Sequence, residues 1–238
     1  MRDKWSTISR FAGNSRLFFD QLFTCELCLE PTGDKSGICA ECYNRLPFSG
    51  LACPQCSEPV STEGRCGRCQ RKPPGYDYSY CSLNYSHPLP HWLHRCKDRR
   101  DRRQIERFLQ LMLDAPPVLS IAPDYLTCIP ASRRRLFQRG FNLSAELTLA
   151  LSAQMKIPIL NNALIKTHHT EQRGAGRKVR AQTTALSVRN TVPHGAHILI
   201  IDDVMTTGST LDEAARLLKQ KGAAIVGGWC LARTPKSF

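Results

Sequence analysis

The sequence has no apolar run long enough to cross a membrane. A membrane-spanning helix needs roughly 18 or more consecutive apolar residues, and none of the 238 residues belongs to such a run. The first residues, MRDKWSTISRFAGNSR, also lack the continuous apolar stretch and small-residue cleavage site of a secretory signal. We therefore expect a protein that has no membrane span and stays in the cytoplasm.

Acidic residues are scarce compared with basic ones. The chain has 20 Asp and Glu against 33 Lys and Arg, and its formal net charge is +13. Residues 1–75 carry ten of the basic and eight of the acidic residues, so most of the excess lies beyond residue 75. A positive surface suits the phosphates of a small ligand or of a nucleic acid, although many basic proteins use such charge only for solubility.

Eight of the twelve cysteines form four Cys-x-x-Cys pairs, separated by ten, ten and nine residues. In a reducing compartment this pattern indicates metal binding rather than disulfides. Two pairs complete a tetrahedral shell of four sulfurs with no open position, so we expect two structural Zn²⁺ sites. The pairs are Cys25/Cys28, Cys39/Cys42, Cys53/Cys56 and Cys66/Cys69.

Two questions about these cysteines stay open at the level of sequence. Sequential sites cost least in loop closure, but the near-equal spacings also permit an interleaved arrangement. Redox chemistry is the competing interpretation of a Cys-x-x-Cys pair, and four copies outside a strand-to-helix context make it the weaker one. The remaining cysteines, Cys81, Cys96, Cys128 and Cys230, lie outside the pattern.

Short apolar runs alternate with helical patterns after residue 75. The segment RKPPG at 71–75 cannot continue a regular element, so we predict a zinc-ribbon module over 1–75 and a second domain over 76–238. A short amphipathic helix at 16–23 should pack on the module. The second domain should be an α/β fold with a parallel sheet covered by helices on both faces. Its expected strands are 76–85, 126–129, 197–201 and 224–231, and its expected helices are 91–113, 142–155 and 209–221.

The stretch HILIIDDVMTTGST at 197–210 is the most informative part of the chain. A buried strand leads into two acids, then into a turn rich in hydroxyls and glycine, and then into a helix that Gly222 should end in a left-handed conformation. Backbone amides and hydroxyls at such a helix start can bind a phosphate. The residues expected to do so are Thr206, Thr207, Gly208, Ser209 and Thr210.

The two acids, Asp202 and Asp203, are placed to accept hydrogen bonds from vicinal sugar hydroxyls. Two other interpretations compete with a phosphate-ribose site. The segment could be a plain strand, turn and helix with a capping Ser or Thr. The paired acids could instead hold Mg²⁺, although the glycine turn would then have no purpose.

IIDDVMTTGST resembles the loop of type I phosphoribosyltransferases that binds phosphoribosyl pyrophosphate (PRPP). Together with the cysteine pairs, a basic helix containing Lys97 and the RGFN element at 139–142, it resembles the ComF/GntX family of competence-associated phosphoribosyltransferase-like proteins over about residues 19–234. The resemblance implies a Rossmann-like fold after a zinc ribbon, and PRPP with Mg²⁺ as ligand. It also implies a role in natural transformation or in the use of imported DNA, with competence or DNA-processing proteins as partners.

Two further segments match the family pattern. The first, PASRRRLFQRGFN at 130–142, has four arginines and no acid, which suits a diphosphate. They are Arg133, Arg134, Arg135 and Arg139. The second, 167–190, resembles the mobile loop that closes over PRPP. Its polar residues are Gln172, Arg177, Arg180, Gln182, Arg189 and Asn190.

The run RCKDRRDRRQIER at 95–107 contains seven basic and three acidic residues. Such a run is often only a solvated helix face. The alternative is a strip that follows the backbone of single-stranded DNA. Its candidates are Arg95, Lys97, Arg99, Arg100, Arg102 and Arg103, with Tyr78, Tyr80, Tyr85 and Trp92 for base stacking. The three histidines at 87, 91 and 94 are separated by Pro88 and Pro90, so we expect no metal site there.

Three functions fit these features. The chain could be an active phosphoribosyltransferase, but we identify no segment that would recognise a base. It could be an adaptor with a vestigial PRPP site, which the intact acids and TTGST turn disfavour. We favour the third function, in which the protein binds PRPP and acts in handling imported single-stranded DNA.

Overall fold

The computed structural model describes residues 24–32, 37–99, 101, 103–166, 186–189 and 191–235. By its contacts the chain divides into two compact units, residues 1–47 and 48–238. The division falls between the second and third cysteine pairs, so each unit contains one quartet. The boundary near residue 75 stays a prediction of where the zinc-binding sequence ends, and the helix expected at 16–23 lies outside the described residues.

The described residues of the first unit form a knuckle and a short helix. A bridge joins Thr24 and Pro31, and the Cys25 amide donates to the Glu30 carbonyl at 2.7 Å. Helix α2 (Ala40–Asn44) starts directly after Cys39, whose sulfur accepts a hydrogen bond from the Cys42 amide at 3.5 Å. The second Cys-x-x-Cys pair therefore straddles a helix start.

The second unit begins with the same arrangement. A bridge joins Ala52 and Pro59, the Cys53 amide donates to the Glu58 carbonyl at 2.8 Å, and α3 (Gly67–Arg71) starts directly after Cys66. The residue after the knuckle has a positive φ in both units, 66° at Leu29 and 53° at Ser57. Residues 25–42 and 53–69 are thus two copies of one structural repeat.

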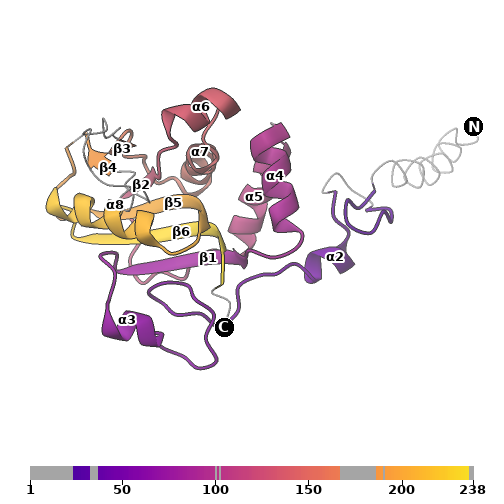
Figure 1. The fold of residues 1–238 in the computed structure, drawn as a ribbon, viewed down its shortest axis with the longest axis horizontal. Helices are drawn as coiled ribbons and strands as arrows, with labels where there is room; N and C mark the ends of the chain where they lie inside the picture. Colours follow the sequence, from indigo (N-terminus) through magenta and orange to yellow (C-terminus); the bar gives the residue numbers. More distant parts are fainter. Residues whose placement is uncertain are drawn as a thin grey trace, which may run out of the picture. The chain divides into compact units, whose positions relative to one another are not determined.

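A four-stranded parallel sheet forms the centre of the second unit (Figure 1). Its order is β1-β6-β5-β2, and every neighbouring pair is parallel. This confirms the expected α/β class. The strands are β1 (Tyr78–Asn84), β2 (Tyr125–Cys128), β5 (His197–Met205) and β6 (Ile225–Arg233).

Helices cover both faces of the sheet. On one face, the buried side chains of α8 (Ser209–Gln220) share an apolar core with Ile198, Ile200 and Val226. A side chain at Gly228 would come within 2.4 Å of Leu211 of α8, so this glycine lets the helix approach the sheet closely. On the other face, α7 (Leu143–Met155) packs on β5 and β2, and α5 (Arg103–Asp114) packs on α7.

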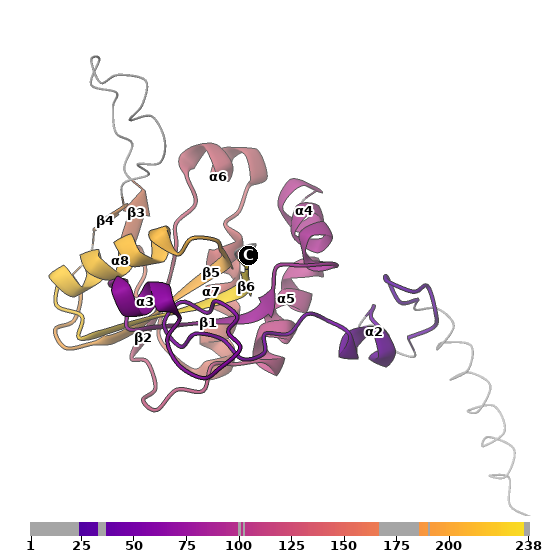
Figure 2. The ribbon, with the colours of Figure 1, turned by 60° about the horizontal axis from the view of Figure 1, so that its bottom comes forward.

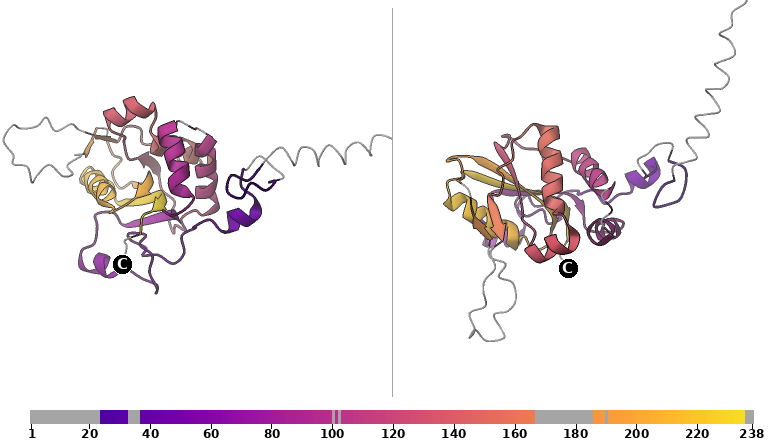
Figure 3. Two further views of the ribbon diagram at one scale, coloured as in Figure 1. Left: turned by 45° about the vertical axis from the view of Figure 1, so that its right-hand side comes forward. Right: turned by 90° about the horizontal axis from the view of Figure 1, so that it is seen from above.

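The single basic helix expected at 91–113 is two helices. They are α4 (Leu89–Arg99) and α5, and they lie side by side (Figure 3). Between them the Asp101 carboxylate accepts from Arg95 at 2.8 Å, Arg103 at 3.1 Å and the Gln104 side chain at 3.3 Å. Three donors converging on one carboxylate fix the bend that separates the helices.

Three smaller elements complete the second unit. Helix α6 (Arg133–Arg139) ends at Gly140, which has φ 79°. Strands β3 (Leu164–Lys166) and β4 (Leu186–Val188) form a two-stranded antiparallel sheet. Gly222 has φ 112° after α8, which confirms the expected left-handed position. Among the described helices, none combines the length and the apolar character needed to cross a membrane.

Candidate functional site

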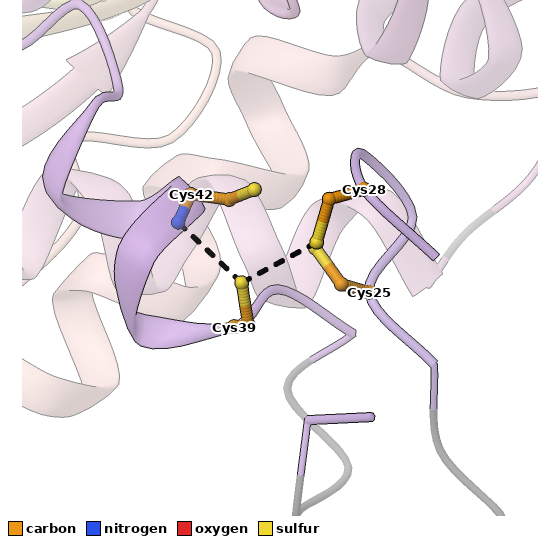
Figure 4. Close-up of side chains that lie close together, drawn as sticks. All are labelled: Cys25, Cys28, Cys39 and Cys42. Atoms are coloured by element: carbon orange, nitrogen blue, oxygen red, sulfur yellow. Dashed lines mark hydrogen bonds between the residues drawn. The ribbon is translucent and has the colours of Figure 1, made fainter. Parts of the chain in front are cut away.

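The eight paired cysteines form two clusters, and each cluster is sequential. They are Cys25, Cys28, Cys39 and Cys42 (Figure 4), and Cys53, Cys56, Cys66 and Cys69. The four sulfurs of each cluster lie within 4.8 Å of one another, and one cross-pair distance in each is 3.6 Å. Sulfurs that surround one Zn²⁺ tetrahedrally are about 3.8 Å apart. Both clusters fit structural zinc, and the interleaved arrangement is wrong.

The thiols of the first cluster differ in acidity. Burial raises the pKa of Cys25, but hydrogen bonds from the backbone of Cys39, Cys28 and Leu27 lower it overall to about 6. Partial burial and the neighbouring thiols raise the pKa of Cys42 to about 12. The backbone thus favours a first thiolate, while full deprotonation requires a cation that offsets the repulsion between sulfurs.

The second cluster is part of the core of the sheet unit. Cys53, Cys56 and Cys69 are buried and belong to the same apolar cluster as Leu211 and Ala214 of α8. Figure 2 views this unit from the side of α3, which follows Cys66. The Gly75 amide also donates to the Asp212 carboxylate of α8. This zinc ribbon is therefore integral to the unit that carries the sheet.

The acid pair lies near the carboxyl end of β5, where ligands bind in open α/β sheets. Asp202 stays in register with Cys230 of β6. Its Oδ1 accepts hydrogen bonds from the Ser144 hydroxyl and the Asp203 amide, both at 2.9 Å. Asp203 forms an ion pair with Lys97 of α4. Both carboxylates are consequently held in place before any ligand arrives.

Asp202 is an unusually weak acid. Burial raises its pKa to about 7, and repulsion from Asp203 adds to the rise, while the Ser144 hydroxyl, the Asp203 amide and Lys97 act in the opposite direction. Near neutral pH this carboxyl exchanges a proton. A bound cation or hydroxyl donor would favour the ionised form.

The residues Thr206–Thr210, called here the phosphate loop, join β5 to α8. Gly208 precedes α8 with φ 78°, and a side chain there would come within 2.8 Å of Met205 Cε and 2.9 Å of Tyr76 Oη. Only glycine fits this backbone. The Thr207 and Ser209 hydroxyls are 2.9 Å apart, and the Ser209 amide donates to Thr207 Oγ1 at 3.3 Å. The loop therefore presents clustered hydroxyls at a helix N-terminus, where an anion is favoured.

A cavity of about 450 Å³, called here the acid-pair cavity, brings both acids together with part of the phosphate loop. Basic side chains from α4, α6 and β3 line this cavity. Burial and the charge of Arg135 lower the pKa of Lys166. The charged lining residues are Asp202, Asp203, Lys97, Arg135, Arg139 and Lys166, and the loop contributes Thr206 and Thr210.

The arginines expected to bind a diphosphate are divided by the structure. Arg139 and Arg135 line the acid-pair cavity, and Arg139 also lies 3.6 Å from Asp98. Arg133 and Arg134 are exposed on α6 and are not among its lining residues. The roles of these arginines stay predictions.

Among the residues expected in the mobile loop, Gln172, Arg177, Arg180, Gln182 and Asn190 lie outside the described residues, and Arg189 is exposed.

The described members of the set expected to bind nucleic acid lie in different surroundings. Lys97 lies in the acid-pair cavity, and Arg95 pairs with Asp101. Arg103 is 86% exposed. Trp92 is fully buried, so its expected stacking on bases is wrong. Arg100, Arg102 and the side chain of Arg99 lie outside the described residues.

An exposed aromatic that the sequence reasoning missed lies on α6. Phe137 is 91% exposed, and Arg133 and Arg134 of the same short helix are exposed as well. Aromatic and basic side chains together are typical of surfaces that bind single strands. The cavity residues Ser144 and Lys166 were missed because neither belongs to a recognisable motif, and only the fold brings them to the acids.

Comparisons with known proteins identify the family of this chain. Residues 146–237 match the phosphoribosyl transferase domain family, and residues 16–70 match the double zinc ribbon domain family. DNA utilization protein YhgH of Escherichia coli strain K12 is 34% identical over 219 residues, which cover 88% of this chain and 96% of that protein. The chain belongs to the ComF/GntX family. This confirms the expected family and its type I phosphoribosyltransferase fold.

A second relative of the ComF/GntX family has a name that refers to competence. Competence protein F of Haemophilus influenzae is 31% identical over 211 residues, which cover 84% of this chain and 91% of that protein. Among solved structures, adenine phosphoribosyltransferase from Thermoanaerobacter pseudethanolicus shares 13% identity at a TM-score of 0.37, over 61% of this chain and 86% of that chain. The relatives thus place this chain in a competence-related family.

Proposed function

We propose that this protein binds PRPP with Mg²⁺ in the acid-pair cavity and acts in the cytoplasm in handling imported single-stranded DNA. The observation that carries the first part is the position of the acid pair directly before the phosphate loop, in one cavity with four cations. The loop suits a 5'-phosphate and the acids suit the ribose hydroxyls. Arg135 and Arg139 supply positive charge for the diphosphate.

Within this proposal Asp202 and Asp203 are the residues that would hold Mg²⁺, because carboxylate oxygens are ligands that Mg²⁺ prefers. The ion would supply positive charge that offsets the negative charge of the diphosphate. The chain's own residues orient the sugar: Ser144 holds Asp202, and Lys97 holds Asp203 until ligand hydroxyls compete for it. Transfer of the phosphoribosyl group to a base or amine is the alternative function, and the family fold supports it equally.

Replacing Asp202 and Asp203 together by Asn should weaken PRPP binding by roughly 10- to 150-fold for each acid, because each lost charge-assisted hydrogen bond costs about 1.5 to 3 kcal/mol. Isothermal titration calorimetry with PRPP and Mg²⁺ measures the loss. Asp114→Asn on α5 is the matched control, since Asp114 does not line the cavity. Unchanged affinity in the double variant would show that the acids do not bind the ribose.

The affinity should also rise with pH. The pKa of Asp202 is about 7, so the carboxyl is mostly protonated at pH 6 and mostly ionised at pH 8. Only the ionised form accepts hydrogen bonds with both oxygens, so binding should tighten between these values, by at most about tenfold per pH unit. Asp202→Asn alone should remove this part of the pH dependence.

Single-stranded DNA should bind with modest affinity and little sequence preference. The excess of basic residues beyond residue 75 supports this part of the proposal, as do exposed Arg103, Arg133, Arg134 and Phe137. Released counterions should give a log-log salt slope of about 0.7 for each contacted phosphate. Fluorescence titration of a labelled oligonucleotide at several salt concentrations measures it.

The DNA test compares three variants. Arg99, Arg100, Arg102 and Arg103 changed to Ser should lower the salt slope by up to about 2.8, which corresponds to four phosphates. Arg133→Ser with Arg134→Ser tests α6, and Arg65→Ser with Lys221→Ser is its control of equal charge. No binding at low salt would contradict the proposal. If only the α6 variant loses affinity, the run at 95–103 is a solvated face.

A further inference from the structure

The second zinc cluster contacts the phosphate loop through Arg68. This residue lies in α3, between Cys66 and Cys69, and both of its terminal nitrogens lie 3.4 Å from the Thr207 carbonyl oxygen. One side chain of the second zinc ribbon thus reaches the backbone of the loop, across 139 positions of sequence.

A second guanidinium, that of Arg233, also joins the second ribbon to the phosphate loop. Arg233, at the end of β6, is fully buried. Its Nε donates to the carbonyl of Cys56 at 3.0 Å, and its Nη1 donates to the carbonyls of Met205 and Thr206. The backbone of a zinc-binding residue and the first residue of the phosphate loop therefore share one cation.

Two further contacts connect the second ribbon with the phosphate loop. Arg233 also forms a buried ion pair with Glu58, two residues after Cys56. Tyr76, which packs in the same core as Cys53, Cys56 and Cys69, sits so close to Gly208 that no side chain fits between them. The loop backbone is thus supported at 206, 207 and 208 by residues that depend on the second ribbon.

We propose that the second zinc centre positions the phosphate loop, so that zinc occupancy at Cys53, Cys56, Cys66 and Cys69 and affinity for a phosphoribosyl ligand are thermodynamically coupled. A ribbon of this size is ordered by its metal. Without the ion, Arg68, Glu58 and the Cys56 carbonyl lose their fixed positions, and the loop carbonyls lose their donors. Coupling is reciprocal, so the ligand must also retain the zinc. The ligand half of this inference rests on the proposed function.

Hydrogen–deuterium exchange of the loop tests the coupling without any ligand. Peptides that cover residues 204–212 should exchange roughly fivefold faster or more in Arg68→Gln, with two zinc ions still bound and with the rest of the sheet unchanged. Arg68→Lys, which keeps one donor, should restore part of the protection. Cys66→Ser should expose the loop further, and Cys28→Ser in the first unit should leave it unchanged. Equal exchange in Arg68→Gln and the parent would overturn the proposal.

Zinc release tests reciprocity. Mg²⁺–PRPP should slow the transfer of one of the two zinc ions to a chromophoric chelator, by about 5- to 150-fold if the coupling free energy has the usual size. Arg68→Gln should reduce that effect. If calorimetry shows PRPP binding but release is unaffected, the coupling is wrong and the proposed function stands. If PRPP does not bind, the proposed function is wrong and the exchange experiment alone decides the coupling.

Discussion

Replacing Cys69 by Ser is expected to destabilise the sheet unit by about 4 kcal/mol or more, whereas Cys28→Ser should leave the unfolding of that unit unchanged. Cys69 is buried in the core shared by α8 and β5, while Cys28 is exposed in the first unit. Structural zinc supplies about 10 to 16 kcal/mol of apparent binding free energy, and the loss of a metal is among the largest effects that one substitution produces.

Thermal unfolding followed by circular dichroism, with zinc content measured for each variant, checks this expectation. The parent should contain two zinc ions per chain, and each variant should lose one. Mild chelation should accordingly remove the ion of the first unit while the sheet remains folded. Removal of the ion bound by the second cluster should accompany unfolding of the sheet. Equal destabilisation by the two substitutions would contradict the assignment of the second ribbon to the core of the sheet unit.

Arg233→Met should cost about 3 to 5 kcal/mol of unfolding free energy. The substitution leaves the Glu58 carboxylate buried without its partner, and it removes donors from the carbonyls of Cys56, Met205 and Thr206. Removing one member of a buried ion pair has a cost of this size, because an uncompensated charge stays in the interior. Urea denaturation of the full chain measures the change.

Two further variants separate the charge effect from simple loss of packing. Arg233→Met combined with Glu58→Gln removes both charges and should recover part of the stability. Arg103→Met removes a guanidinium that is 86% exposed, and an exposed pair of this kind contributes less than about 1 kcal/mol. A cost below 1 kcal/mol for Arg233→Met would show that the buried pair does not hold the second ribbon to the sheet.

The sequence predicts the sheet well because its strands are short apolar runs with clear ends. The strand expected at 197–201 extends to Met205, since Val204 and Met205 still pair with β6. Asp202 and Asp203 conceal this extension, because the continuous apolar run ends at the acids. The expected helix at 91–113 divides at Asp101, and a carboxylate that collects three donors cannot be recognised from helical periodicity.

The arrangement of the acid pair and the proposed phosphate loop was predictable because these residues are consecutive. The acids and the TTGST turn are one segment, so their order on a strand, a loop and a helix start fixes their relative positions. Arg233, Arg68 and Lys97 differ, because each meets a partner more than 100 positions away. Local pattern carries no information on such pairs.

The order of the strands has a consequence for how the chain folds. Among the four strands of the described sheet, β1 pairs with β6 alone, and their first residues are separated by about 150 positions. During synthesis the second ribbon and β1 emerge early, but β1 cannot join the rest of the sheet until β6 has been made. Contacts of such long range slow folding and leave apolar edges exposed in the meantime. Early capture of zinc would order residues 53–69 during this interval, giving the late strand a preformed surface on which to close the sheet.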